Sequence, residues 1–154
     1  MNYWRMQLHP SDSGRAVAHT MKSLGLGYIG LDFQNPPGDL TDVKREDIDA
    51  TQRDYWEFAH VMEKDDKVLV VAHHYPCALV EVSGEYNYIR RPEEELGIWF
   101  RHLRRVKVIG YYADFVTKPG AWEQTTMTDT ISILKAKGGV SYQLIERWLL
   151  QSAA

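Results

Sequence analysis

The apolar residues of this chain follow two different spacings. In some segments every second residue is apolar or the run is continuously apolar, as in strands, and in others the spacing is helical. Strand-like patterns occur in residues 3–8, 27–33, 68–75, 77–89 and 97–113. Helix-like patterns occur in residues 15–24, 41–63 and 141–150, and residues 128–133 fit either a short helix or an extended segment.

Turn-forming and capping residues separate these segments. The Pro-Pro-Gly of residues 36–38 stops either kind of element, and Ser141 can cap the last helix. The order is strand, helix, strand, helix, a run of strands and a final helix, which predicts an α+β fold. Because the strands bend past Pro76 and Gly84, we expect a half-open β-barrel of about five to six strands flanked by helices, in a single domain over residues 1–154.

The composition is that of an ordinary globular protein, with 44% hydrophobic and 25% charged residues. No apolar run reaches the roughly 18 residues that span a membrane, and the N-terminal residues lack the apolar core of a signal peptide. We therefore expect a cytoplasmic location and no membrane partner. Cys77 is the one cysteine, which excludes a disulfide framework within the chain and a cysteine-rich zinc site.

The sequence contains none of the common catalytic or phosphate-binding motifs. It has no G-x-G-x-x-G, P-loop, G-x-S-x-G or H-E-x-x-H segment. Cys77 would need a neighbouring base to act as a nucleophile, and His73 and His74 are the local candidates. Neighbouring strand residues point to opposite faces, so these two histidines are poorly placed to hold one metal ion. We predict a chain that is not an enzyme and uses no cofactor and no metal.

Basic residues cluster in the last long strand-like segment. The net charge of −3 excludes a uniformly basic nucleic-acid binder, so such binding would need a local patch. In a strand, Arg101, Arg105 and Lys107 share one face, and Arg104 lies on the other. A cationic face suits phosphate groups, and it equally fits a solvated surface that protects a sheet edge. Aromatic residues make up 12% of the chain, and those beside these cations suit stacking on bases.

Four segments carry a resemblance to a known family. Residues 3–10 are YWRMQLHP, residues 27–40 run from GYIGLDF to GDL, and residues 65–88 contain DDKVLVV and EVSGEYNY. Residues 99–111 are WFRHLRRVKVIGY. In this order they resemble the PUA-like superfamily, and within it the EVE and YTH-like reader domains of McrB-type restriction systems. Residues 31–33, Leu-Asp-Phe, replace the family's usual Gly-Trp.

The resemblance implies a non-catalytic reader that captures a flipped modified base, a methylated cytosine or adenine in DNA. It offers Asp32 as acceptor for the exocyclic amine of either base. The implied pocket residues are Tyr28, Asp32, Phe33, Trp56, His73, His74, Tyr75 and Trp99. The implied contacts to the nucleic-acid backbone are Arg90, Arg91, Arg101, Arg104, Arg105 and Lys107.

The resemblance also implies partners and leaves other functions open. A reader without effector motifs would work with a nuclease or motor protein. An RNA-binding PUA-like module would use the same fold on structured or single-stranded RNA. An ASCH-like ribonuclease and a sensor of free nucleosides share the superfamily fold and are the remaining alternatives.

Overall fold

Seven strands and three α-helices form within the part of the chain that this computed structural model describes, residues 1–8, 16–33, 36–72, 75–93, 95, 98–112 and 130–152. The strands are β1 (Tyr3–Gln7), β2 (Tyr28–Leu31), β3 (Lys67–Ala72), β4 (Tyr75–Val82), β5 (Asn87–Tyr88), β6 (His102–Tyr111) and β7 (Ile131–Ile133). The α-helices are α1 (Ala16–Leu26), α2 (Arg53–Trp56) and α3 (Val140–Ser152). Shorter turns are η1 (Arg45–Asp47), η2 (Ala50–Gln52) and the π-helical η3 (Glu57–Val61). None of the described helices has the length and apolar character needed to cross a membrane.

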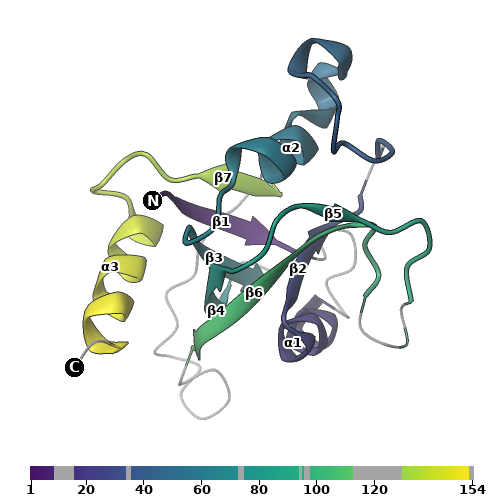
Figure 1. The fold of residues 1–154 in the computed structure, drawn as a ribbon. Coiled ribbons are helices and arrows are strands. Elements are labelled where there is room, and N and C mark those ends of the chain that lie inside the picture. Colours follow the sequence, from purple (N-terminus) through teal and green to yellow (C-terminus); the bar gives the residue numbers. More distant parts are fainter. Residues whose placement is uncertain are drawn as a thin grey trace.

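The strands join in one mixed sheet that curls into a half-barrel (Figure 1). Their order across the sheet is β2-β6-β4-β3-β1-β7, and β5 pairs with β6 beside this row. β1 runs parallel to β3, and the other pairs are antiparallel. The predicted α+β class and the half-open, curled sheet are confirmed.

Alternation along β1 explains how the two sides of the sheet are filled. Trp4 and Met6 are fully buried in the main core, which α1 and the α2–η3 segment also line with Leu24, Tyr55 and Phe58. Tyr3 points the other way and belongs to a second, smaller cluster beneath α3. Figure 1 shows α1 and α3 at different ends of the sheet, so the two clusters are covered by different helices.

The predicted helix over residues 41–63 is wrong in its extent. Helical turns begin at Arg45, and Ile48 is extended, with φ −110° and ψ 153°, so η1 and η2 are separate turns. The Asp49 carboxylate accepts a hydrogen bond from the backbone N–H of Thr51 at 2.9 Å and starts the second turn. Because such a side chain offers the backbone an alternative to helical bonding, the segment breaks before Ala50. From there η2, α2 and η3 follow one another without a gap.

Pro76 lies inside β4, although its position predicts an interruption between two strands. Val71 pairs with Pro76 and Val70 pairs with Ala78, so Cys77 is an extra residue on the β4 side of the ladder. This bulge lets a residue without a backbone N–H stay in the sheet. The sequence of residues 128–133 fits either a short helix or an extended segment, and the structure shows residues 131–133 as the strand β7.

Asp66 ties the beginning of β1 to the turn before β3. Its fully buried carboxylate accepts hydrogen bonds from the backbone N–H of Asn2 and the indole N–H of Trp4, each at 2.9 Å. It also accepts from the backbone N–H of Glu63 at 3.0 Å. Three donors converge on this one carboxylate, so Asp66 fixes Trp4 in the core.

Candidate nucleic-acid interface

The register of the β2–β6 ladder determines which side chains meet at the candidate interface. Tyr28 of β2 pairs with Arg105 of β6, and directly opposite residues of antiparallel strands lie on the same face. The same register, continued one step beyond the last ladder pair, brings Asp32 opposite Arg101. These two residue pairs lie on the face that we call the outer face of the ladder.

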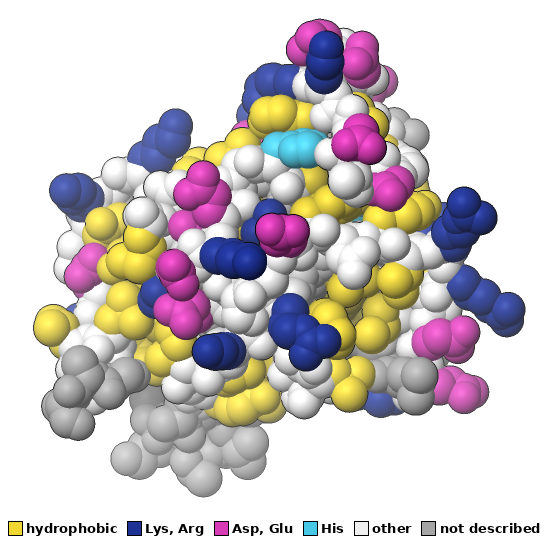
Figure 2. Space-filling model, viewed as in Figure 1, with side chains coloured by type: hydrophobic (Ala, Val, Ile, Leu, Met, Phe, Trp, Pro, Cys, Tyr) yellow, Lys and Arg dark blue, Asp and Glu magenta, His cyan; other side chains and the backbone are white. Residues whose placement is uncertain are grey.

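At one end of the outer face, Arg105 rests against Tyr28. Its Nη2 donates to the Tyr28 hydroxyl at 2.7 Å, and its guanidinium carbon lies 5.1 Å from the centre of the ring. Lys107 follows on the same face and is exposed, opposite Glu81 of β4. Figure 2 shows Lys and Arg side chains, with acidic side chains among them, on the side where Figure 1 shows β6. Arg105 and Lys107 therefore form a track of exposed cations with neighbouring acids, and the buried Leu103 lies between them and Arg101 on the same face.

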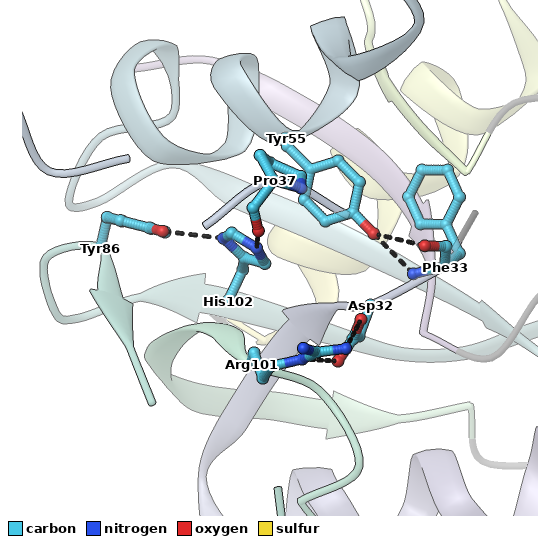
Figure 3. A network of polar contacts seen from close by, with 7 residues as sticks. All are labelled: Asp32, Phe33, Pro37, Tyr55, Tyr86, Arg101 and His102. Carbon is cyan, nitrogen blue, oxygen red and sulfur yellow. Dashed lines mark hydrogen bonds and ion pairs between the residues drawn. The ribbon is translucent and has the colours of Figure 1, made fainter. Parts of the chain in front are cut away.

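At the other end of the outer face, Arg101 and Asp32 form a two-pronged ion pair. Arg101 Nε donates to Oδ2 of Asp32 at 2.9 Å, and Nη2 donates to Oδ1 at 3.3 Å (Figure 3). The hydrogen bond and charge of Asp32 raise the pKa of Arg101 above its ordinary value. The Arg101 side chain is 39% exposed and the Asp32 side chain 9%, so the arginine presents a fixed charge to solvent.

Just past β2, Phe33 turns to the inner side and stacks on Tyr55 of α2. The ring centres are 4.8 Å apart and the planes differ by 14°. The Tyr55 hydroxyl donates to the carbonyl oxygen of Phe33 at 3.1 Å and accepts from its backbone N–H at 2.5 Å. Burial raises the pKa of Tyr55 to about 12, so the hydroxyl keeps the proton that it donates. Two hydrogen bonds and a ring stack thus hold Phe33 in place beside the Asp32–Arg101 pair (Figure 3).

His102 holds the loop after β2 against the sheet. Its Nε2 lies 3.0 Å from the carbonyl oxygen of Pro37, and its Nδ1 lies 2.7 Å from the Tyr86 hydroxyl (Figure 3). Because a carbonyl only accepts, Nε2 carries the proton and Nδ1 of the neutral ring accepts from Tyr86. Burial lowers the pKa of His102, which favours this neutral form. The backbone N–H of Leu40 donates to the same Tyr86 hydroxyl at 3.2 Å, so both ends of residues 37–40 are tied down.

Four aromatic residues of the implied pocket, Tyr28, Phe33, Trp56 and Trp99, have different neighbours. Tyr28 packs against Arg105 and Phe33 packs against Tyr55, as described above. Trp56 lies between Arg45, at 5.4 Å from its ring centre, and the imidazole of His60, at 5.1 Å. The Trp99 indole N–H donates to the carbonyl oxygen of Leu8 at 3.1 Å, and its ring lies 4.9 Å from that of His19 and 5.2 Å from that of Phe100. Of these four rings, Phe33 is the one that stacks face to face, with Tyr55, among the described residues, and Trp56 belongs to a separate group.

Arg104 corrects the predicted set of backbone contacts. It is 5% exposed and lies on the inner side of β6, with Nη2 3.3 Å from the carbonyl oxygen of Ala59 and Nη1 3.4 Å from that of Gly84. Burial lowers its pKa. A guanidinium held under the sheet cannot reach a phosphate on the outer face without giving up these contacts.

The other predicted residues divide into exposed and undescribed ones. Arg90 and Arg91 are exposed in the turn after β5, and Arg91 Nε lies 3.8 Å from a Glu93 carboxylate oxygen. His73, His74 and the side chain of Tyr75 lie outside the described residues.

The implied pocket set does not include Tyr55, Tyr86 or His102, which the structure places in this region. A signal for Tyr55 was present, because its spacing to Phe58 and Met62 is that of an apolar helix stripe, and all three are buried. The neighbouring Trp56 falls outside that stripe. The contact of Tyr86 with His102 joins residues from different strands and has no local signature.

The arrangement offers a cation track, an ion pair and stacked rings, which together suit an anionic ligand with a planar group. Within the described residues, no three His, Cys, Asp or Glu side chains gather as a metal site would require. Comparison of the sequence with protein-family models and with curated proteins finds no match.

Proposed function

We propose that this chain is a non-catalytic reader of modified DNA with a PUA-like fold of the EVE and YTH-like kind. The captured base is a methylated cytosine or adenine flipped out of the duplex. The observation that carries the proposal is the end of the β2–β6 ladder, where the Asp32–Arg101 pair on the outer face is followed directly in the chain by Phe33, whose ring stacks on Tyr55. A cation, a carboxylate and an aromatic ring are the groups that suit a phosphate, an exocyclic amine and the plane of a base.

The exposed cations of the outer face hold the DNA backbone in this proposal. Arg105 is supported by Tyr28 and Arg101 by Asp32, so both present their donors with less rotamer entropy to lose on binding. Lys107 extends the same track along β6. Such contacts give affinity that is independent of sequence and falls as salt is added.

The base stacks on the side of Phe33 that faces away from Tyr55. Stacking of a base on an aromatic side chain contributes about 1–3 kcal/mol. Burial of the added methyl group contributes about 0.8 kcal/mol more, which is the basis for preferring a modified base. Asp32 accepts from the exocyclic amine with the lone pairs that Arg101 does not use. As a reader, this chain performs no chemical step, so a nuclease or motor protein supplies the effector activity.

Fluorescence anisotropy with matched duplexes tests the proposal. The duplexes share one sequence and carry no modification, a methylated cytosine or an adenine methylated on its amine, and a fourth probe is the matching RNA. We expect one methylated duplex to bind about fourfold more tightly than the unmodified one, as one buried methyl group allows. Equal or absent binding to the three DNA duplexes would falsify the reader function, and preference for the RNA would replace it with an RNA-binding module.

A pair of substitutions locates the base site. Phe33→Leu keeps an apolar side chain and removes the ring, so binding of the methylated duplex should weaken by about tenfold. Trp56→Leu removes a ring that lies with Arg45 and His60, and it should leave the affinity unchanged. The opposite result would move the base site to Trp56. Thermal unfolding of both variants checks that the fold is retained.

A further inference from the structure

A cavity of about 580 Å³ lies at the β7 end of the sheet, away from the β2–β6 ladder. It is formed by β1, β7, the residues that connect β7 to α3, and the first turn of α3. Small-molecule sites in proteins commonly occupy about 300–1,000 Å³. β2 and β7 are at the two ends of the strand order, and Figure 1 shows α3 on the side of the sheet opposite to β2, so this cavity is separate from the candidate nucleic-acid interface.

Polar side chains from three elements converge in this cavity. Arg5 of β1 lies opposite Ser132 of β7 in the strand register, so both project from the same face. Arg5 Nη1 donates to the hydroxyl of Ser141, in the first turn of α3, at 3.1 Å. Ser141 is only 4% exposed, so its hydroxyl is fixed beside the guanidinium. A guanidinium and two hydroxyl groups therefore share one small volume.

The lining of the cavity is cationic, although the whole chain is acidic. Among the described residues, those that line it include two cations, Arg5 and Lys135, and no carboxylate. Glu146 of α3 lines the neighbouring cavity, where it accepts a hydrogen bond from Tyr3 at 2.7 Å. A guanidinium binds a phosphate or carboxylate through two parallel hydrogen bonds, and hydroxyl groups can supply further donors.

Apolar side chains complete the wall and give room for the carbon part of a ligand. Ile133, Leu134 and Tyr142 line the cavity beside the polar groups. The Tyr142 ring is tilted against that of Tyr3, with ring centres 4.8 Å apart, which fixes its position. Few convergent polar groups within a mostly apolar wall are typical of sites for small organic ligands.

We propose that this cavity is a second binding site, independent of the nucleic-acid interface, for a small organic anion that carries a phosphate or carboxylate group. Arg5 and Lys135 supply the positive charge. Ser132 and Ser141 orient the oxygen atoms. Ile133 and Tyr142 contact the carbon skeleton.

Backbone amide chemical shifts of the whole chain provide the first test. Inorganic phosphate, acetate and a nucleoside monophosphate are titrated separately, with the free nucleoside and with sodium chloride at equal ionic strength as controls. We expect saturable shifts centred on residues 132–142 with phosphate or acetate. The monophosphate should bind more tightly than inorganic phosphate if the ligand is an organic phosphate, and acetate should bind more tightly if it is a carboxylate. The absence of shifts there, or equal shifts with chloride, overturns the proposal.

Matched lysine variants provide the second test, by calorimetric titration of the anion that shifts most. Lys135→Gln should weaken binding about threefold, as expected for one exposed charge. Lys137→Gln removes the same charge two residues away, from a residue that does not line the cavity, and should leave affinity unchanged. Equal weakening by both variants would mean attraction to net charge and not a site. Arg5→Gln should weaken binding by about tenfold or more, and the lysine pair decides the matter if that variant does not fold.

Discussion

Arg104 and Arg105 are neighbours in β6 and have opposite surroundings. Arg105 is exposed on the outer face of the ladder, against Tyr28. Arg104 is 5% exposed and is hydrogen-bonded to main-chain carbonyl oxygens beneath the sheet. Strand alternation alone separates them. The number of cations in a segment is therefore a poor measure of the charge that a partner meets.

The two faces of this ladder also differ in what each interaction contributes. On the outer face, pairs such as Asp32 with Arg101 stand partly in water, where an ion pair adds little to stability and can be shared with a ligand. On the inner face, polar groups such as His102 are buried, and an unpaired one is costly. Substitutions of the buried polar groups on the inner face should thus change stability more than substitutions of the exposed charges on the outer face.

Arg104→Ala should have the largest effect. It removes a buried side chain and leaves the carbonyl oxygen of Ala59 without this donor, so we expect a loss of about 3 kcal/mol in the free energy of unfolding. The matched change Arg105→Ala should cost less than about 0.5 kcal/mol, as surface substitutions do. Urea unfolding of both variants measures the difference. Similar losses would show that the two faces are energetically alike.

Tyr86→Phe should have the next largest effect. The missing hydroxyl leaves Nδ1 of His102 and the backbone N–H of Leu40 without that partner, at a cost of about 1–2 kcal/mol. Tyr88→Phe is the control, because its ring also packs on His102, at 5.0 Å, and its hydroxyl makes no hydrogen bond within the described residues. Chemical unfolding should show a larger loss in the free energy of unfolding for Tyr86→Phe than for Tyr88→Phe. Equal losses would mean that the missing hydrogen bonds are not the cause.

Acid should reduce the free energy of unfolding by a smaller amount, through protonation of His102 on the inner face. Burial holds its pKa in the folded chain below the ordinary value of 6.5, so the unfolded chain binds this proton more readily. The contribution of His102 to stability is therefore complete above pH 6.5 and decreases as the pH falls below it. A histidine-resolved NMR titration should find the His102 midpoint below 6.5, together with lower stability in acid. A midpoint above 6.5 would contradict a neutral, buried ring.

Asp32→Asn should have the smallest effect on stability, on the order of 0.5–1 kcal/mol, because the pair with Arg101 is partly exposed. Added salt should reduce the difference between the variant and the original protein. Melting temperatures at low and high salt measure both quantities. A loss of stability several times larger and insensitive to salt would show that this ion pair stabilises the fold as the buried polar groups of the inner face do.

Local sequence patterns predict the strands well and the contacts between them poorly. Alternation predicts that Arg105 and Lys107 are exposed on one face, and the burial pattern of residues 104–107 agrees, whereas Leu103 on the same face is buried. The pairing of Asp32 with Arg101 depends on the β2–β6 register, which joins residues far apart in the chain and leaves no local trace.

The helix predicted over residues 41–63 shows a second limit of local sequence patterns. Apolar spacing over residues 41–63 identifies the buried stripe of α2 but not the break at Asp49. That break depends on a side chain binding its own backbone, which competes with the helix at a single residue. Trp56 follows Tyr55 directly and lies outside the buried stripe, with Arg45 and His60 as its neighbours.

The place of β1 in the sheet has a consequence for the order of folding. β1 is synthesised first, yet it lies between β3 and β7, so its two edges are completed at residues 67–71 and 131–133. Until β7 leaves the ribosome, one edge of the strand that carries Trp4 has no partner in this sheet. Pairing between residues far apart in the chain slows folding. Until β7 forms, the unpaired edge of β1 can associate with other chains. A nascent chain halted after β6 should therefore bind chaperones more strongly than the completed chain.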